Sequence, residues 1–361
     1  MSKFLHSKFS ALAPYDTSEE LESMNGGYVR LNTNESPFEP SVNVIKNVRT
    51  AAGTLNFYSD PDCTKLREKL SELMNIKPSE IVFGNGSDEI LNFIFTAFCE
   101  HGAAFPDITY SFYKILAKFH GVDFVNIPLD ENFKINPDDY KNLNRKTILI
   151  TNPNAPTGIF LELKDIEKII NQNPESLIVV DEAYIDFGDG SPAGGESAKN
   201  LIHEYKNLIV VRTFSKSRAM AGARLGWAMA CEEIIKDMNA VKNTFTPYNI
   251  NSMTQAAGLA ALEDEEITQK NINIIKNIRD EVKNNLRGMG FEVLNSSTNF
   301  LFARHEKISG EKIFEALKRK KIMIRHFSKP ERISNFNRIT IGTEEQMKIF
   351  LEILREIISN N

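Results

Sequence analysis

The chain has 361 residues, more than one ordinary hydrophobic core accommodates, and its 42% hydrophobic and 25% charged residues are typical of soluble two-domain proteins. Its formal net charge of -5 argues against a protein that binds nucleic acid by neutralising phosphates. Three widely spaced cysteines, no signal-peptide pattern and no long apolar run predict a cytoplasmic protein with no metal site and no membrane partner.

Residues 1–32 are expected to form an N-terminal arm, because the segment is polar and is interrupted by a glycine pair at 26–27. It leads into L-N-T-N-E-S-P-F at 31–38, a loop dense in hydrogen-bonding side chains, and then into the aromatic loop F-Y-S-D-P-D at 57–62. The pattern of apolar residues predicts a strand at 28–31 and helices at 42–52 and 64–74.

A glycine turn, G-N-G-S-D-E at 84–89, lies between an apolar strand at 81–83 and an apolar helix at 90–98. Glycines let backbone N–H groups approach an anion, and the helix N-terminus attracts its charge, so the turn is a candidate phosphate site. The alternative is that Ser87 or Asp88 only caps the helix. Tyr110, in the aromatic segment that follows, is either a core residue or a surface on which a flat ring stacks.

Three apolar strands come next, and each ends in polar residues. The first, 147–151, runs into N-P-N-A-P-T-G at 152–158, a rigid loop in which either X–Pro bond can be cis. The second, 177–180, ends in D-E-A-Y at 181–184, where a buried acid requires a positive partner. Strands of this kind predict a mainly parallel sheet covered on both faces, with ligands at the carboxyl ends of its strands.

The third strand, 208–211, leads to Ser215 and Lys216, followed by small residues and Arg224. A lysine at the end of a buried strand loses hydration, which is expected to lower its pKa. Its neutral amine would then be a nucleophile suited to a Schiff base with a carbonyl compound. The alternative is an ordinary surface lysine, since most lysines are exposed.

Beyond residue 250 the pattern changes to a second α/β unit. A long helical pattern at 252–286, with a break near Asp264, is followed by shorter strands and helices. We therefore expect an arm at 1–32, a large domain at 33–250 and a small domain at 251–361. In the small domain the sequence predicts strands at 291–294, 300–303, 322–325 and 337–341 and helices at 310–319 and 343–358.

The residues at the strand ends together match one ligand, pyridoxal phosphate. Its aldehyde requires a lysine, its phosphate a glycine turn and an arginine, and its flat ring an aromatic residue. Its ring nitrogen has to stay protonated to act as an electron sink, and Asp181 would favour the protonated form. The phenol of Tyr184 can hold the 3-oxygen of the ring.

These segments resemble the fold-type I pyridoxal-phosphate-dependent aminotransferases of class I/II, over nearly the whole chain. The motifs quoted above carry the resemblance, together with S-K-S-R-A-M-A-G-A-R-L-G at 215–226, where the lysine precedes an arginine by eight positions. The segments at 31–38 and R-I-T-I-G-T at 338–343 are most similar to the histidinol-phosphate branch. The resemblance implies a large α/β domain, with a mainly parallel sheet between helices, and a smaller α/β domain.

The resemblance also implies a role for each candidate residue. Lys216 would form the internal aldimine and move the substrate proton, Asp181 would pair with the ring nitrogen, and Tyr184 would hold the 3-oxygen. Relatives carry asparagine at the position of Ala155, so here either Asn154 supplies that bond or Tyr184 acts alone. The remaining implied contacts are Tyr110 stacked on the ring; Gly86, Ser87, Asp88, Ser215 and Arg224 at the phosphate; Tyr58 at the phosphate of a homodimer partner's cofactor; and Arg325 and Arg338, with Tyr15 and Asn34 nearby, at the anionic end of the substrate.

The implied reaction is a ping-pong transfer of an amino group between L-histidinol phosphate and 2-oxoglutarate. Two alternative enzymes share the motifs, an aromatic amino-acid aminotransferase and a threonine-phosphate decarboxylase. A further alternative is a protein that kept the fold and binds the cofactor without turnover. Such proteins commonly lose the lysine or the aspartate, and this chain has both Lys216 and Asp181.

Overall fold

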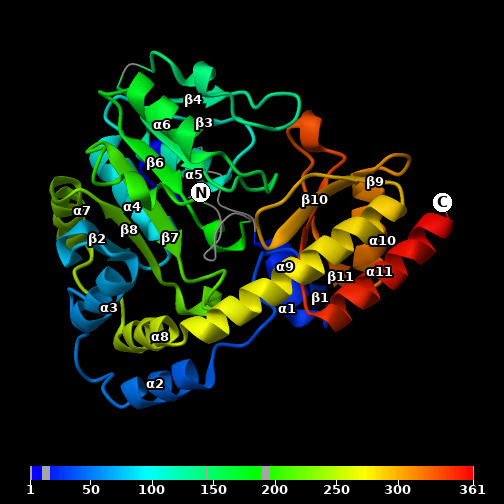
Figure 1. Ribbon diagram of the computed structural model, residues 1–361, viewed down its shortest axis with the longest axis horizontal. Coiled ribbons are helices and arrows are strands. Elements are labelled where there is room, and N and C mark those ends of the chain that lie inside the picture. The colour runs from blue at the N-terminus through cyan, green and yellow to red at the C-terminus, as the bar shows by residue number, and fades with distance from the viewer. Residues whose placement is uncertain (1, 10–16, 144, 189–195, 361) are drawn as a thin grey trace.

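The computed structural model describes residues 2–9, 17–143, 145–188 and 196–360 of the chain. Within these residues the helices and strands form a larger and a smaller body, and the long helix α9 (Glu265–Gly288) runs from one to the other (Figure 1). None of the described helices combines the length and the apolar character that a membrane crossing requires.

The larger body is built on a seven-stranded sheet with the strand order β2-β8-β7-β6-β5-β3-β4. Only β8 runs antiparallel to its neighbours, which confirms the predicted mainly parallel sheet. The strands are β2 (Ile81–Gly84), β3 (Ala103–Pro106), β4 (Phe124–Ile127), β5 (Thr147–Thr151), β6 (Ile178–Asp181), β7 (Leu208–Thr213) and β8 (Gly226–Ala230).

Helices cover both faces of this sheet, because successive residues of each strand point to opposite sides. In β6, Ile178 and Val180 pack on one core, whereas Val179 packs on the other. Both cores are fully buried, which explains why the central strands are apolar throughout. One face carries α4 (Ser87–Phe98), α5 (Phe112–His120) and α7 (Glu232–Phe245), and the other carries α2 (Val42–Ala52), α3 (Thr64–Met74), α6 (Leu163–Gln172) and α8 (Ser252–Glu263).

The smaller body is built on an antiparallel sheet with the order β12-β13-β10-β9, which packs against α9, α10 and α11. The predicted strand 322–325 is divided here: Ile322 and Met323 pair with the N-terminal strand β1, whereas Arg325 pairs with β13. The elements are β1 (Val29–Arg30), β9 (Phe291–Val293), β10 (Phe300–His305), α10 (Gly310–Arg319), β11 (Ile322–Met323), β12 (Arg325–His326), β13 (Asn337–Thr340) and α11 (Glu344–Ser359).

The larger and the smaller body meet near Asp264, where α8 ends and α9 begins. The predicted break in this helical pattern is therefore confirmed. Helix α8 packs on α2 and α3 of the larger body (Figure 1). This packing favours a change of domain near Asp264, and a boundary between residues 250 and 251 stays a prediction.

Candidate active site

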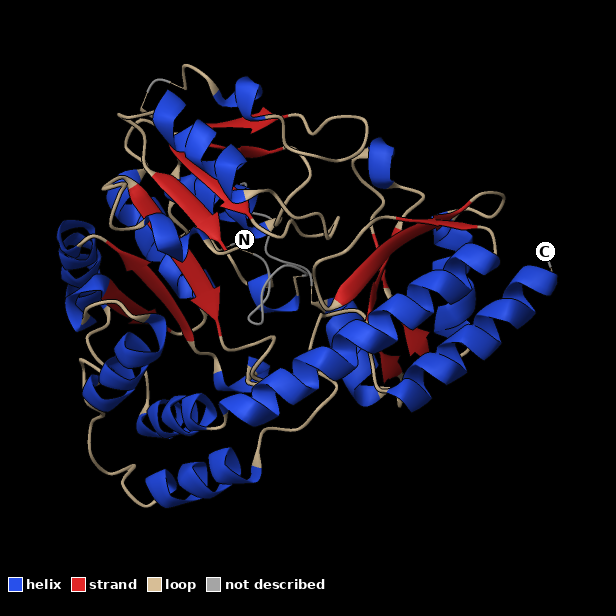
Figure 2. Cartoon of the chain, viewed as in Figure 1, coloured by secondary structure: helices blue, strands red, loops and turns tan. Residues whose placement is uncertain are grey.

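A cavity of about 1190 Å³ lies between the two bodies, at the carboxyl ends of β5, β6 and β7. The arrowheads of parallel strands in the larger sheet point toward this region (Figure 2). Gly86, Asn154 and Tyr58 are not among the residues that line the cavity, and Tyr15 lies outside the described residues. The predicted site residues that line it are Asn34, Ser87, Asp88, Tyr110, Asp181, Tyr184, Ser215, Lys216, Arg224, Arg325 and Arg338.

The glycine turn before α4 forms a tight cradle. Gly86 has φ +83°, and a Cβ there would lie 2.4 Å from an Nη atom of Arg224. A Cβ on Gly226 would lie 2.3 Å from the backbone nitrogen of Ser87, so the turn packs directly on β8. Arg224 forms an ion pair with Asp88 in the first turn of α4, at 2.9 Å. The cradle thus combines a helix N-terminus with an arginine, as an anion site requires.

Asp181 lies fully buried at the end of β6 beneath the cavity. The Oη of Tyr113 donates to Oδ2 at 3.0 Å, and the backbone N–H of Ala183 donates to Oδ1 at 3.2 Å. Burial outweighs these bonds and raises the pKa of Asp181 to about 7. A cation placed against this carboxylate would compensate for the lost hydration, as the protonated ring nitrogen of the expected cofactor does.

Lys216 follows β7 and its amine points into the cavity. The Nζ atom donates to the backbone oxygen of Thr33 at 3.3 Å and lies 5.8 Å from the ring centroid of Tyr184. Before it, the backbone N–H of Ser215 donates to Oγ1 of Thr213 at 3.1 Å, which fixes the first turn of the loop. The amine therefore stands between the larger body and the N-terminal segment.

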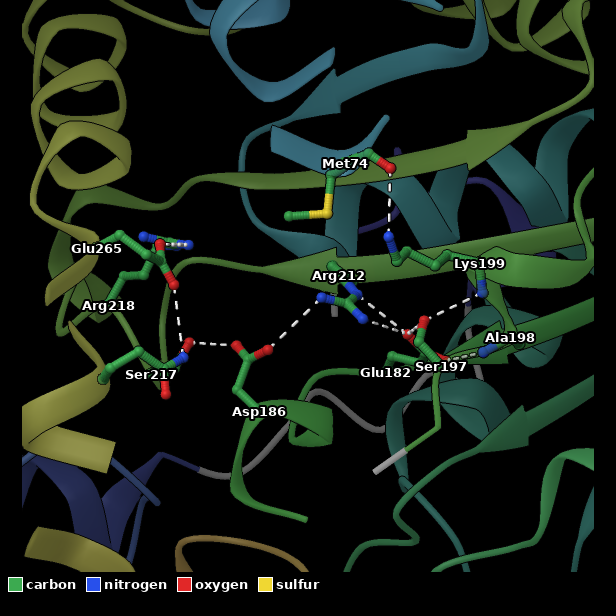
Figure 3. A network of polar contacts seen from close by, with 11 residues as sticks. Met74, Glu182, Asp186, Ser197, Ala198, Lys199, Arg212, Ser217, Arg218 and Glu265 are labelled. Carbon is green, nitrogen blue, oxygen red and sulfur yellow. Dashed lines mark hydrogen bonds and ion pairs between the residues drawn. The ribbon is translucent and has the colours of Figure 1, made fainter. Parts of the chain in front are cut away.

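A buried polar network anchors the loops that carry Asp181 and Lys216 (Figure 3). The carboxylate of Glu182 is fully buried and pairs with Arg212 at 2.9 Å. Arg212 also contacts Asp186 at 3.5 Å, and Asp186 accepts a hydrogen bond of 2.5 Å from the hydroxyl of Ser217. Because each buried charge has a partner of opposite sign, the network ties the two loops together without an uncompensated charge.

Tyr184 contacts both the N-terminal segment and the smaller body. Its Oη accepts a hydrogen bond of 2.8 Å from Nδ2 of Asn34, and its ring packs edge-on against Phe300 of the smaller body. Asn34 is itself buried, with an exposed fraction of 1%. Its side chain thus contacts Tyr184 and also lines the cavity, and a substrate role for Asn34 stays a prediction.

Asn154 does not reach the cavity. Its Nδ2 donates at 3.0 Å to Oγ1 of Thr157 in its own loop and at 3.0 Å to the backbone oxygen of Ile108, which follows β3. Both X–Pro bonds of this loop, Asn152–Pro153 and Ala155–Pro156, are cis. Ala155, in contrast, lines the cavity. The geometry therefore favours the alternative in which Tyr184 acts without Asn154.

Arg325 and Arg338 face one another across the antiparallel pair β12–β13. Arg338 donates to the backbone oxygen of Asn32 at 2.8 Å, and Arg325 pairs with Glu19 of helix α1 (Ser18–Asn25) at 2.7 Å. Two like charges on opposed positions are unfavourable unless an anion lies near them. The pair is therefore a candidate anion subsite, in which Arg325 holds Glu19 at 2.7 Å and has Glu20 at 3.9 Å.

Two aromatic residues differ in their placement. Tyr110 lines the cavity, donates to Asp88 at 2.9 Å, and has its pKa raised well above the usual value, chiefly by burial. Tyr58, with an exposed fraction of 84%, stacks on Tyr248 at the surface, with ring centroids 4.6 Å apart. Tyr58 therefore does not belong to the cavity of its own chain.

Some supporting residues were not identified from the sequence. Tyr113 lies in the first turn of α5, and Tyr110 precedes this helix by two positions; their closeness in sequence is the signal that could have linked Tyr113 to the site. Arg212 is a charged residue within an apolar strand, which indicates a buried partner, but the sequence does not show that Glu182 is that partner.

The residues present fit pyridoxal phosphate. The cradle at Gly86 leaves no room for a side chain and offers an arginine to a phosphate, whereas the buried Asp181 lies where a ring cation would compensate its charge. The lysine lines the same cavity, as a cofactor with an aldehyde requires. The fold and the site thus define a transferase of the pyridoxal-phosphate type.

Comparison with known proteins identifies the family. The profile of aminotransferase class I and II matches residues 27–354, and the chain belongs to this family. It is 42% identical over 363 residues to the histidinol-phosphate aminotransferase of Brachyspira hyodysenteriae, with 100% of both chains covered. It is also 42% identical to that of Pseudomonas syringae pv. syringae, over 99% of this chain and 100% of the relative.

A solved structure agrees with the fold. The histidinol-phosphate aminotransferase from Sinorhizobium meliloti in complex with pyridoxal-5'-phosphate superposes with a TM-score of 0.88 at 25% identity, covering 99% of this chain and 100% of that one. The predicted fold-type I architecture is confirmed.

Proposed function

We propose that this chain is a histidinol-phosphate aminotransferase, which transfers an amino group between L-histidinol phosphate and 2-oxoglutarate. The observation that carries the proposal is the opposed pair Arg325 and Arg338, which faces the cavity that holds Lys216. The full-length similarity to relatives of that name supports it.

Pyridoxal phosphate supplies an aldehyde that binds an amine and a ring that takes up the electron pair released at the substrate carbon. The turn at residues 86–88, with Ser215 and Arg224, would hold its phosphate. Asp181 would keep its ring nitrogen protonated, and Tyr184 would donate to its 3-oxygen. Lys216 would anchor the aldehyde and, once the amino donor has taken its place, carry the proton to and from the substrate α-carbon.

The same subsite has to accept a phosphate monoester and a dicarboxylate in turn. The planar fork of an arginine forms paired hydrogen bonds with either group. An incoming anion would compete with Glu19 for Arg325 and would meet Arg338 already oriented by Asn32. Exchange of one carboxylate for another anion keeps the charge near these arginines balanced.

A spectrum of the protein with pyridoxal phosphate, recorded while each amino donor is added without an oxo acid, tests the substrate. We expect the cofactor to convert to its amine form at a much lower concentration of L-histidinol phosphate than of L-phenylalanine or L-tyrosine. Equal or better conversion with the aromatic acids would assign the aromatic alternative. Release of CO₂ from L-threonine phosphate would assign the decarboxylase instead.

Replacing Arg338 by alanine should raise the KM for L-histidinol phosphate by about 10- to 100-fold, because a charge-assisted hydrogen bond to the substrate anion is lost. Steady-state kinetics measures this change. A matched control is Arg304→Ala, which removes an exposed arginine on the neighbouring strand β10 that pairs with Glu292. An unchanged KM in the Arg338 variant would contradict the assignment of the subsite.

We infer a homodimer from the surface around Tyr58. Tyr58 and Tyr248 form an exposed stack, and Phe57 and Phe245, also exposed, are the neighbouring apolar residues in sequence. A second copy of the chain would cover these side chains and receive Tyr58 at its own cofactor site. The proposal includes a cytoplasmic location, since Cys63, Cys99 and Cys231 are free thiols of the kind that a reducing compartment maintains.

Mixing two inactive variants tests the shared site. Refolded mixtures of Lys216→Ala and Tyr58→Ala chains should regain roughly a quarter of the wild-type activity, because half of the dimers are mixed and each has one complete site. Each variant refolded alone is the control. Activity of the mixture equal to the mean of the two separate variants would show that Tyr58 does not serve a partner.

A further inference from the structure

Asn34 has all four of its polar groups bonded in the described structure. Its Nδ2 donates to Oη of Tyr184 at 2.8 Å, and its Oδ1 accepts from the hydroxyl of Thr340 at 3.1 Å. Its backbone N–H donates to the same Thr340 hydroxyl at 3.0 Å, and its backbone oxygen accepts from Nδ2 of Asn299 at 3.0 Å. Thr340 and Asn299 both belong to the smaller body, so this body fixes the orientation of the Asn34 amide.

That orientation decides where the phenolic proton of Tyr184 points. A tyrosine hydroxyl has a single proton to donate. Because Nδ2 of Asn34 is a donor, Oη of Tyr184 acts as the acceptor in this bond, and its proton stays available to the cavity. With the amide reversed, Oδ1 of Asn34 would take that proton, and Tyr184 would have none to donate. The hydroxyl of Thr340 favours the orientation shown, since it accepts from the backbone N–H of Asn34 and donates its proton to Oδ1.

The direction in which the Tyr184 hydroxyl donates matters because of the residue at position 155. Ala155 lines the same cavity as Tyr184 but has no side-chain donor, and Nδ2 of the preceding Asn154 is already bonded to Ile108 and Thr157. Of these three described residues, Tyr184 is therefore the one with a side-chain proton to donate into the cavity.

We propose that Asn34, held by Thr340, is a positioning residue that keeps the Tyr184 hydroxyl turned toward the 3-oxygen of the cofactor and so compensates for alanine at position 155. The inference rests on the proposed function, because Tyr184 contacts the 3-oxygen only if pyridoxal phosphate binds as described. It assigns Asn34 to the cofactor side of the site, acting through Tyr184, and not to the substrate.

A spectrophotometric pH titration of the bound cofactor tests the proposal. A donor to the 3-oxygen stabilises its negative charge, and the loss of that donor makes the bound cofactor hold its proton more tightly. We expect Asn34→Asp, which replaces the donating amide by an acceptor, to raise the titration midpoint by about tenfold in proton affinity. Thr340→Val, which frees the amide to reverse, should shift the midpoint in the same direction. Lys216 and Tyr110 lie near Tyr184, Asp181 lies near Tyr110, and all three are unchanged in these variants.

A double-mutant cycle distinguishes an effect of Asn34 that acts through Tyr184 from a general effect of the added charge. In a Tyr184→Phe background, Asn34→Asp should add almost nothing, because its partner is already gone. Ala155→Asn should restore the wild-type midpoint in the Asn34→Asp chain, since it adds a donor at the wall of the cavity. The matched control is Asn32→Asp, which places the same carboxylate in the same loop, where Asn32 has no side-chain hydrogen bond among the described residues.

Two results would overturn the inference: additive shifts in the double variant, or an equal shift in Asn32→Asp. Thermal unfolding of each protein without cofactor confirms that the variants compared are folded. Failure of the wild-type chain to take up pyridoxal phosphate would instead overturn the proposed function, and it would be seen before any variant is compared.

Discussion

Lys216→Ala is expected to lower kcat by about 10⁴-fold, because in the proposed reaction one amine both anchors the cofactor and moves the substrate proton. The structure places this amine in the cavity, at 3.3 Å from the backbone oxygen of Thr33 and facing Tyr184. Its loop is fixed independently of the amine by the bond between Ser217 and Asp186. The variant should therefore fold normally and still bind pyridoxal phosphate through the cradle at Gly86. Single-turnover conversion of L-histidinol phosphate measures the loss.

Lys199→Ala is the matched control for this variant. Lys199 is a half-buried lysine of the same region, and its amine donates to the backbone oxygen of Met74, outside the cavity (Figure 3). We expect its kcat to stay within about twofold of the wild type, as for a substitution away from the reacting groups. A Lys216→Ala enzyme that kept a tenth of the wild-type rate would rule out the proposed role.

Asp181→Asn should have two opposite effects. Activity should fall by about 10³-fold, since a neutral amide does not stabilise a protonated ring nitrogen. The protein without cofactor should become more stable at pH 8, because burial has raised the pKa of Asp181 from 3.8 to about 7. A carboxylate with a raised pKa contributes stability that is fully present below pH 3.8 and is lost as the pH rises through 7.

The expected gain in the free energy of unfolding is about 3 kcal/mol at pH 8. The raised pKa of the carboxyl corresponds to about 4 kcal/mol, and the asparagine amide loses one of the two hydrogen bonds that the carboxylate accepts. Urea unfolding of the cofactor-free proteins at pH 8 and at pH 4 measures it. The advantage of the variant should disappear at pH 4, where the wild-type carboxyl is largely protonated. A variant less stable than the wild type at both pH values would show that Asp181 is not held in an unfavourable charged state.

The central elements of the larger body could be predicted because their sequence patterns are strong. Helices α2 and α3 have the predicted bounds, and the apolar strands β5, β6 and β7 lie where they were expected. Strand β4 was missed because it is an edge strand with two exposed residues, and β3 because its short apolar run ends in proline. Strand β8 was missed because it begins in the segment after Lys216, which was interpreted as part of the cofactor site.

The gathering of most candidate residues around one cavity could be predicted, because they follow strands whose carboxyl ends meet at one edge of the sheet. Its cross-links could not be predicted, since they join distant parts of the sequence. Asn34 and Tyr184 are separated by 150 positions, and Glu19 and Arg325 by 306. No local pattern fixes such pairs, because they depend on how the two bodies pack. From the sequence Asn34 was assigned to the substrate, and its bond to Tyr184 is a long-range contact that the sequence does not indicate.

The pairing of β1 with β11 has a consequence for how the chain matures on the ribosome. The N-terminal strand β1 cannot form this pairing until Ile322 and Met323 have been translated, near the C-terminus. The larger body can assemble earlier, since domains fold as units during synthesis. A nascent chain released before Ile322 would therefore hold the cofactor half of the site, without a partner for β1 and without Arg325 and Arg338. A cellular check on cofactor binding alone would not detect such a fragment, whereas a check on the burial of the N-terminal strand would detect it.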